Sequence, residues 1–153
     1  MRKKEKEITD PIEIEEIIRK AEVCRIGLVD GDEPYIVPVC FGYERNALYF
    51  HCAPEGRKID LIKKNNQVCV EIDTDVEIID AEKPCGWSTK YRSVIGVGRA
   101  AILEEEEAKA HGLNVIMQHY AGDTNYTEFE KLGAACVVKI DIESMTGKKS
   151  GYQ

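Results

Sequence analysis

A histidine, a glycine and two adjacent cations lie close together in HCAPEGRK, which runs from His51 to Lys58. Gly56 marks a turn, and the stretch from Arg57 to Asn65 predicts a short helix directly after it. The start of a helix presents unpaired N–H groups and the positive end of its dipole, so it favours anions and disfavours cations. A bound phosphate would therefore explain this cation pair, with Gly56 allowing close backbone approach. A solvated helix start explains the pair as well, since exposed Arg-Lys dipeptides are common.

His51 ends a strand-like run immediately before this turn. A single histidine at a strand end is usually a polar residue with ordinary hydrogen bonds, and its position beside EGRK is what makes it a candidate site residue. His111 and His119 lie eight residues apart in an expected helix, which is not a metal-ligand spacing. The histidines therefore give one candidate and no metal site.

A glycine motif, GVGRAA from Gly96 to Ala101, matches the dinucleotide-binding pattern G-x-G-x-x-A literally. That interpretation requires the glycines to connect a strand to a helix. Here the strand pattern continues through Ile102, so we reject it. The glycines instead indicate bends or a close approach of a neighbouring strand or a flat ligand.

The six cysteines contain no CxxC pair and predict neither a zinc site nor a disulfide frame. Four of them lie in apolar strand-like runs, where a reduced thiol behaves as a small buried hydrophobe; these are Cys24, Cys40, Cys69 and Cys136. Cys52 and Cys85 lie beside candidate site residues, and their burial stays open.

The elements that would position these residues begin with TDPIEIEEIIRKA, which predicts a helix. Asp10 can cap it, Pro11 suits its first position, and Glu13 stands at the reciprocal position of a capping box. Strands are expected at 24–30, 34–43, 47–51, 67–74, 91–103 and 135–142, and further helices at 57–65 and 104–120. Pro38 restricts its strand to an edge or a bulge. A short strand and an irregular segment are expected between 75 and 90. Together these predict a small antiparallel barrel with α decoration.

The composition fits one globular domain over residues 1–153, with a net charge of −7 from 28 acidic and 21 basic residues. This charge argues against a nucleic-acid partner, which requires clustered cations. No apolar run is long enough to span a bilayer, and the first residues lack the apolar region of a signal peptide. We expect a cytoplasmic protein without a membrane partner.

A long segment, PYIVPVCFGYERNALYFHCAPEGRKIDLIKKNNQVCVEID, resembles the FMN-binding split-barrel family of pyridoxamine 5'-phosphate oxidase-like proteins. It is most similar to the flavin-nucleotide-binding branch related to nitroimidazole-resistance (Nim-type) proteins. CGWSTKYRSVIGVGRA and IDIESMTGKKSG also resemble that branch. The resemblance covers nearly the whole chain from ITDPIEIEEII onward.

The resemblance implies a six-stranded antiparallel split β-barrel, mainly β, that forms a homodimer with two FMN sites at the interface. The flavin ring would be lined largely by backbone, at Val37, Pro38, Val39 and Cys40, and the chain would pass it at His51, Cys52 and Ala53. Arg57 and Lys58 match the family's Arg-Lys pair, with the lysine nearer the phosphate. The second subunit would contribute Trp87, Tyr91, Arg92, Ser93 and Gly96.

The implied activity is FMN-dependent reduction of a small acceptor, such as a nitroaromatic or a quinone, with a nicotinamide electron donor. His51 matches a histidine on the substrate side of the flavin and could donate a proton, since imidazole exchanges protons near neutral pH. A flavin carrier or redox sensor without turnover is an alternative, as is a split barrel that binds haem or a deazaflavin. The sequence ends in MTGKKSGYQ and lacks the oxidase's substrate-binding Arg-x-His pattern, so oxidation of pyridoxamine phosphate is not expected.

Overall fold

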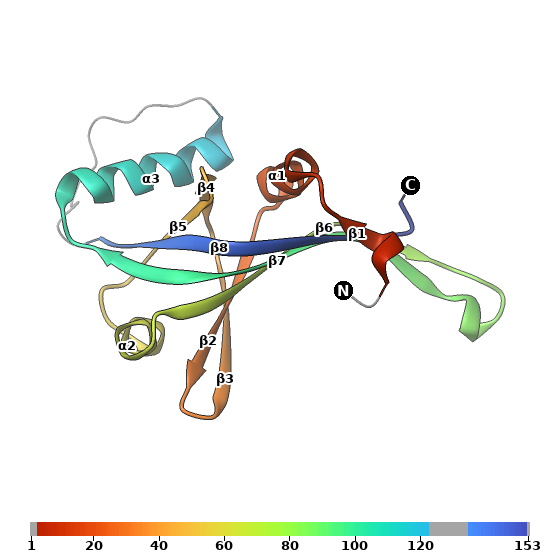
Figure 1. Cartoon of the computed structure of the whole chain (residues 1–153), viewed down its shortest axis with the longest axis horizontal. Helices are drawn as coiled ribbons and strands as arrows, with labels where there is room; N and C mark the ends of the chain where they lie inside the picture. The colour runs from red at the N-terminus through yellow and green to blue at the C-terminus, as the bar shows by residue number, and fades with distance from the viewer. Residues whose placement is uncertain (1–2, 123–134, 153) are drawn as a thin grey trace.

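An open antiparallel sheet dominates the fold (Figure 1), and the computed structural model describes residues 3–122 and 135–152. The strands follow the order β3-β2-β6-β7-β8-β5-β4, and β1 pairs with β8. Because the two ends of this path, β3 and β4, do not pair within the described residues, the sheet does not close. The mainly β, split-barrel class expected from the sequence is confirmed, but the described sheet has eight strands where six were expected, because one expected strand is divided in two and β1 is added. The helices are α1 (Pro11–Lys20), α2 (Arg57–Lys64) and α3 (Glu106–Ala121), and the strands are β1 (Glu7–Ile8), β2 (Cys24–Asp30), β3 (Glu33–Val39), β4 (Gly42–Glu44), β5 (Ala47–Cys52), β6 (Gln67–Ile79), β7 (Ser88–Leu103) and β8 (Cys136–Ser150).

The strand expected at 34–43 is divided in two. β3 ends at Val39, the chain bends through Cys40 and Phe41, and β4 resumes at Gly42. β3 is an edge strand that pairs with β2 alone, so the missing N–H of Pro38 costs the sheet no central hydrogen bond. The bend lets the side chain of Phe41 become completely buried.

The segment between 75 and 90, expected to contain a short strand and an irregular segment, forms a two-stranded arm. β6 continues to Ile79, a 3-10 turn spans Pro84–Gly86, and β7 begins at Ser88. A register shift between Thr74 and Glu77 marks where this arm leaves the body of the sheet, and the arm projects beyond it (Figure 1). The pairing of β6 with β7 forms this two-stranded arm, and no local sequence pattern predicts that pairing.

Helix α1 begins as its sequence predicts. The carboxylate of Asp10 accepts a hydrogen bond from the backbone N–H of Ile12 at 3.0 Å, and Pro11 occupies the first helical position. Glu13 does not complete a capping box, because its carboxylate instead accepts a hydrogen bond from Lys149 on β8 at 3.1 Å. The apolar face is buried, as expected, through Ile14, Ile17 and Ile18.

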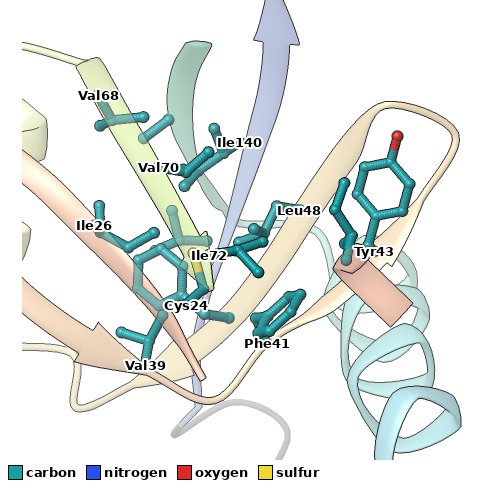
Figure 2. Packing of buried hydrophobic residues seen from close by; sticks show 14 of the residues in the cluster. Cys24, Ile26, Val39, Phe41, Tyr43, Leu48, Val68, Val70, Ile72 and Ile140 are labelled. Atoms are coloured by element: carbon teal, nitrogen blue, oxygen red, sulfur yellow. The ribbon is translucent and has the colours of Figure 1, made fainter. Parts of the chain in front are cut away.

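Buried apolar residues from every strand of the sheet meet in one core cluster, part of which is drawn in Figure 2. Ile26 of β2, Ile72 of β6 and Ile140 of β8 are almost completely inaccessible to solvent. Burial of one such side chain contributes about 1.5–3 kcal/mol to folding. This core fixes the strand ends on which the candidate site lies.

The cysteines follow the prediction only in part. Cys24 and Cys136 are buried, whereas Cys40 and Cys69, which we expected to be buried, are exposed. Cys40 lies in the bend after β3, and Cys69 belongs to the outward-facing residues of β6, since alternate strand residues face opposite sides. All six are free thiols.

Two glycines permit close contacts between elements. A Cβ atom on Gly98 would lie 2.3 Å from the carbonyl oxygen of Asp141, so glycine is required where β7 and β8 shift register. All of Gly96–Ala101 lies within β7, which excludes the strand-to-helix turn of a dinucleotide motif. A Cβ on Gly112 would lie 3.0 Å from the Tyr49 ring, so its absence lets α3 lie on β5. No helix among residues 3–122 and 135–152 is long and apolar enough to cross a bilayer.

Candidate functional site

The start of α2 lies between the β2–β3 turn and the end of β5. The guanidinium of Arg57 donates to Asp30 Oδ2 at 3.3 Å from Nε and 3.2 Å from Nη2, and it lies 4.7 Å from the centre of the Tyr35 ring. One residue later, Lys58 Nζ lies 5.7 Å from the centre of the Phe50 ring on β5. Of the two adjacent cations, Arg57 therefore contacts the β2–β3 hairpin and Lys58 contacts β5.

The charges of the two cations are balanced differently. Arg57 pairs with Asp30 and lies 3.7 Å from a carboxylate oxygen of Glu33. Lys58 is half-buried and pairs with no carboxylate within the described part of the chain. Its charge acts instead on the thiol of Cys52, whose pKa burial and the neighbouring Cys136 raise to about 11 while Lys58 opposes the rise. Lys58 is thus the cation available to an anionic ligand.

Gly56 provides the space for such a ligand. Its φ of +131° lies in a region that favours glycine, and a Cβ atom built there would meet no atom within 4 Å. Gly56 accepts the first helical hydrogen bonds, from Ile59 N at 2.9 Å and Asp60 N at 3.1 Å. No side chain caps the helix, so its first N–H groups are available. Backbone donors, an uncompensated ammonium group and open space together form a site for a phosphate.

His51 and Cys52 end β5, opposite Val137 and Cys136 of β8. Phe50 is buried, His51 is exposed and Cys52 is half-buried, because successive strand residues face opposite sides of the sheet. The imidazole therefore faces solvent and bonds to no residue in the described ranges. It can contact a ligand, but it lies on the opposite face of β5 from the Phe50 ring that Lys58 approaches.

The four residues expected to line a flavin ring lie at the end of β3 and in the following bend. Pro38 and Cys40 are exposed, Val37 is half-buried and Val39 is buried. Since β3 is an edge strand, one side of its backbone has no partner strand in the described structure and can donate or accept hydrogen bonds to a ligand. Ala53, directly after β5, is exposed.

The remaining predicted residues are Trp87, which directly precedes β7, and residues of the first part of β7, which starts in the arm at the opposite end of the sheet from α2 (Figure 1). Trp87 is 57% exposed at the tip of the arm, Tyr91 and Ser93 are half-buried, and Arg92 donates to Asp75 at 2.7 Å. Gly96 faces inward, where a Cβ atom would lie 2.8 Å from Val70. One chain therefore does not bring these residues to the α2 group.

Sequence reasoning missed Asp75, which organises the base of the arm. Its φ of +53° is left-handed, and its carboxylate pairs with Lys20 of α1 and Arg92 of β7. Hydrogen bonding from Lys20, and then from Arg92, lowers the pKa of Asp75 although burial opposes the shift. A cavity of about 480 Å³ lies beside it, lined partly by Thr74, whose buried hydroxyl oxygen has no partner in the described structure. The only sequence signal was an aspartate directly after the strand expected at 67–74, a residue type that is depleted in strands.

The outer face of β2, β3, β6 and β7 exposes apolar side chains. Val29 is 47% exposed, Ile36 66% and Val97 41%. They surround a hollow of about 500 Å³ that also contacts Arg25 and Glu71. Burial and the adjacent Asp73 raise the pKa of Glu71, while Arg25 lowers it. Such a contiguous apolar surface is typical of a protein–protein contact.

A sequence model of the family described as pyridoxamine 5'-phosphate oxidase matches residues 10–149. The chain is also similar to the crystal structure of a candidate 5-nitroimidazole antibiotic resistance protein from Bacteroides thetaiotaomicron. The two share 35% identity and a TM-score of 0.82, over 94% of this chain and 86% of the other.

More distant similarities concern the fold alone or a short stretch. The FAD- and haem-binding protein from Mycobacterium smegmatis aligns with a TM-score of 0.84 at 16% identity, over 96% of this chain and 74% of that one. The uncharacterized protein RA0666 of Rhizobium meliloti (strain 1021) is 32% identical over 60 residues, which span 39% of each chain. The match thus covers well under half of that relative's length.

Proposed function

The chain belongs to the pyridoxamine 5'-phosphate oxidase family, and from this premise we propose that it binds FMN and passes electrons to a small organic acceptor. The observation that carries the proposal is the state of Lys58, a half-buried ammonium group at the start of α2 with no carboxylate partner among the described residues. A flavin nucleotide supplies the phosphate that such a site requires. The adjacent N–H groups would share its charge.

The residues near α2 suit the rest of such a ligand. The unpaired backbone side of β3 and the bend at Cys40 can hold a flat polar ring by hydrogen bonds, and Gly56 leaves space for the phosphate. FMN, when bound, supplies the redox chemistry, and the protein supplies orientation and electrostatics. In this arrangement Lys58 fixes the phosphate and His51, exposed in the last part of β5, donates a proton to the reduced acceptor.

The second half of the proposed site comes from another copy of the chain. The arm, which carries Trp87 and leads into the first part of β7 with Tyr91 and Arg92, lies at the opposite end of the sheet from α2 (Figure 1), which supports a site shared between two copies. The apolar outer face around Ile36 and Val97 offers a contact surface for a two-fold dimer. Two such sites per dimer follow from the symmetry.

The acceptor class follows from similarity and from the openness of the site. The B. thetaiotaomicron protein is a candidate 5-nitroimidazole antibiotic resistance protein, which makes a nitroimidazole the first acceptor to test and a quinone the second. NADH or NADPH is the proposed electron donor. Without turnover, the same site would serve as a flavin carrier or redox sensor.

The absorption spectrum of the purified protein is the first test. FMN gives two absorption bands, one in the blue and one in the near-ultraviolet, and the FMN released on denaturation can be identified by its mass. A Soret band would indicate haem, which the M. smegmatis protein of this fold binds together with FAD, and a deazaflavin spectrum would likewise contradict FMN. Steady-state oxidation of NADH or NADPH with a nitroimidazole then separates a reductase from a carrier.

A further inference from the structure

Cys52 and Cys136 are directly opposite each other on neighbouring antiparallel strands, β5 and β8. Residues opposite each other in such a ladder have Cα atoms about 4.5–5.5 Å apart and side chains on the same face. A disulfide spans Cα atoms about 4.4–6.8 Å apart, so the backbone need not rearrange to allow one. Cys24 and Cys69 have no cysteine opposite them in their strand pairs.

The two thiols also differ in solvent accessibility. This difference suits a thiol–disulfide exchange in which one thiol reacts first and the other reacts second. Cys52 is half-buried, so a small reagent can reach it, whereas Cys136 is only 6% exposed. The Cys136 thiol interacts directly with that of Cys52, and the Lys58 charge favours the Cys52 thiolate. Cys52 is therefore the thiol that an external reagent meets first, and Cys136 is positioned to resolve the product.

We propose that Cys52 and Cys136 are a redox-active pair that closes to a disulfide by exchange with a low-molecular-weight disulfide such as oxidised glutathione. The Cys52 thiolate attacks one sulfur of the reagent, the reagent's S–S bond breaks, and one thiolate leaves. The Cys136 thiolate then attacks Cys52 Sγ in the mixed disulfide and releases the second thiolate. The cysteines lose two electrons and two protons, and one molecule of reagent becomes two thiols.

The bond would tie β5 to β8 around a covalent loop that contains β6, β7 and α3. Closing a long loop restricts the unfolded chain, so the oxidised protein should melt several degrees higher than the reduced protein. The bond would also fix the strand end that leads into Gly56 and Lys58. The pair itself does not depend on the proposed flavin, so its test stands apart from that proposal.

The test incubates the full chain with oxidised glutathione, blocks the remaining thiols with iodoacetamide, and maps the peptides by mass spectrometry. We expect a peptide linked through Cys52 and Cys136, which the reductant dithiothreitol separates. The exchange rate should rise roughly tenfold per pH unit between about pH 7 and 10, because the Cys52 thiolate is scarce below a pKa of about 11.

Cys136→Ser provides the decisive variant. Without the resolving thiol, Cys52 should accumulate as a stable mixed disulfide with glutathione, whereas Cys85→Ser, a change in an exposed cysteine of the arm, should leave the linked peptide unchanged. A stable mixed disulfide at Cys52 in the wild type would overturn the proposal. So would a linked peptide that joins Cys52 to a cysteine other than Cys136, or no reaction at Cys52 at all.

Discussion

Arg57 of α2 and Asp30 at the end of β2 are joined by two hydrogen bonds, in which Nε and Nη2 of the guanidinium both donate to one carboxylate oxygen. The same guanidinium lies over the Tyr35 ring, so Arg57 anchors the helix start to the β2–β3 hairpin. Lys58, the next residue, has no such counter-charge in the described part of the chain. The two adjacent cations are therefore placed differently: Arg57 fixes the helix start and Lys58 is available for a ligand.

Lys58→Ala should weaken FMN binding roughly 10- to 100-fold, since a charge-assisted hydrogen bond contributes about 1.5–3 kcal/mol. Riboflavin lacks the phosphate, so it should bind poorly to the wild type and lose little more in the variant. Fluorescence titration measures both affinities. Lys64→Ala is the matched control, because Lys64 is exposed at the other end of the same helix. Equal weakening of FMN and riboflavin would show that Lys58 does not bind the phosphate.

Arg57→Ala should weaken FMN binding less than Lys58→Ala does, because Arg57 already pairs with Asp30. Its loss should also lower stability by no more than about 1 kcal/mol, as for other exposed ion pairs. Isothermal titration of FMN and urea unfolding give the two quantities. A loss of FMN affinity larger than that of Lys58→Ala would mean that Arg57 leaves Asp30 to bind the phosphate.

His51→Ala should slow acceptor reduction by about 10²-fold or more if the imidazole donates the proton, while FMN affinity stays nearly unchanged. Turnover is measured with NADH and a nitroimidazole, and FMN occupancy by absorbance. His111→Ala serves as the control. His111 is an exposed histidine of α3 that pairs with Glu44 of β4 and is not part of the proposed site. Unchanged turnover with full FMN occupancy would leave His51 as a solvated strand end.

The local features of the fold were predictable, and the long-range ones were not. The Asp10 cap, the buried isoleucines of α1 and the helix after Gly56 follow from neighbouring residues alone. The arm depends on pairing between distant segments of β6 and β7, and Cys69 is exposed because of the side of the sheet it faces. The alternation of residues along a strand does not show which face of the sheet is covered, so the sequence could not predict that Cys69 is exposed. It could not predict the arm either, because strand pairing is not a local property.

For the candidate site, the sequence suggests individual residues, and the structure shows which of these residues lie near one another. The clustering of Gly56 and Lys58 at a helix start follows from their proximity in the chain. That His51 faces away from the Phe50 side of β5 follows from strand alternation, and the hairpin pattern contained this information. That Arg92 is held by Asp75 depends on the backbone turning left-handed at the register shift, which no spacing rule indicates.

Ile36→Asp should convert a dimer to a monomer, because it places a charge in the centre of the apolar outer face of β2, β3, β6 and β7. Ile36 is 66% exposed in one chain, so the change should not unfold it. Ile12→Asp is a matched control, since Ile12 is 68% exposed on α1. Sedimentation velocity gives the mass of each variant. A wild-type protein that is monomeric with FMN bound would refute the two-chain site.

Asp75→Asn should destabilise the protein at neutral pH but not at low pH. The carboxylate pairs with Lys20 and Arg92, and its pKa lies below the ordinary value of 3.8. A lowered pKa means that the stabilisation is complete above this ordinary value and is lost as pH falls through the lower, folded-state pKa. Because Lys20 is 63% exposed, solvent screens the pair and its contribution is only about 1 kcal/mol.

Asparagine keeps the shape of Asp75 and tolerates its left-handed backbone, so this change tests the charge alone. The melting temperature of Asp75→Asn should lie a few degrees below that of the wild type from about pH 7 to 5, and the gap should narrow below about pH 4. High salt should narrow it at neutral pH as well. Asp32→Asn is the control, because Asp32 is exposed in the β2–β3 turn and forms no ion pair with the described residues. A gap that persists unchanged into acid would mean that Asp75 acts through its backbone geometry, including the hydrogen bond that its carbonyl accepts from Tyr152 at 2.7 Å, and not through its charge.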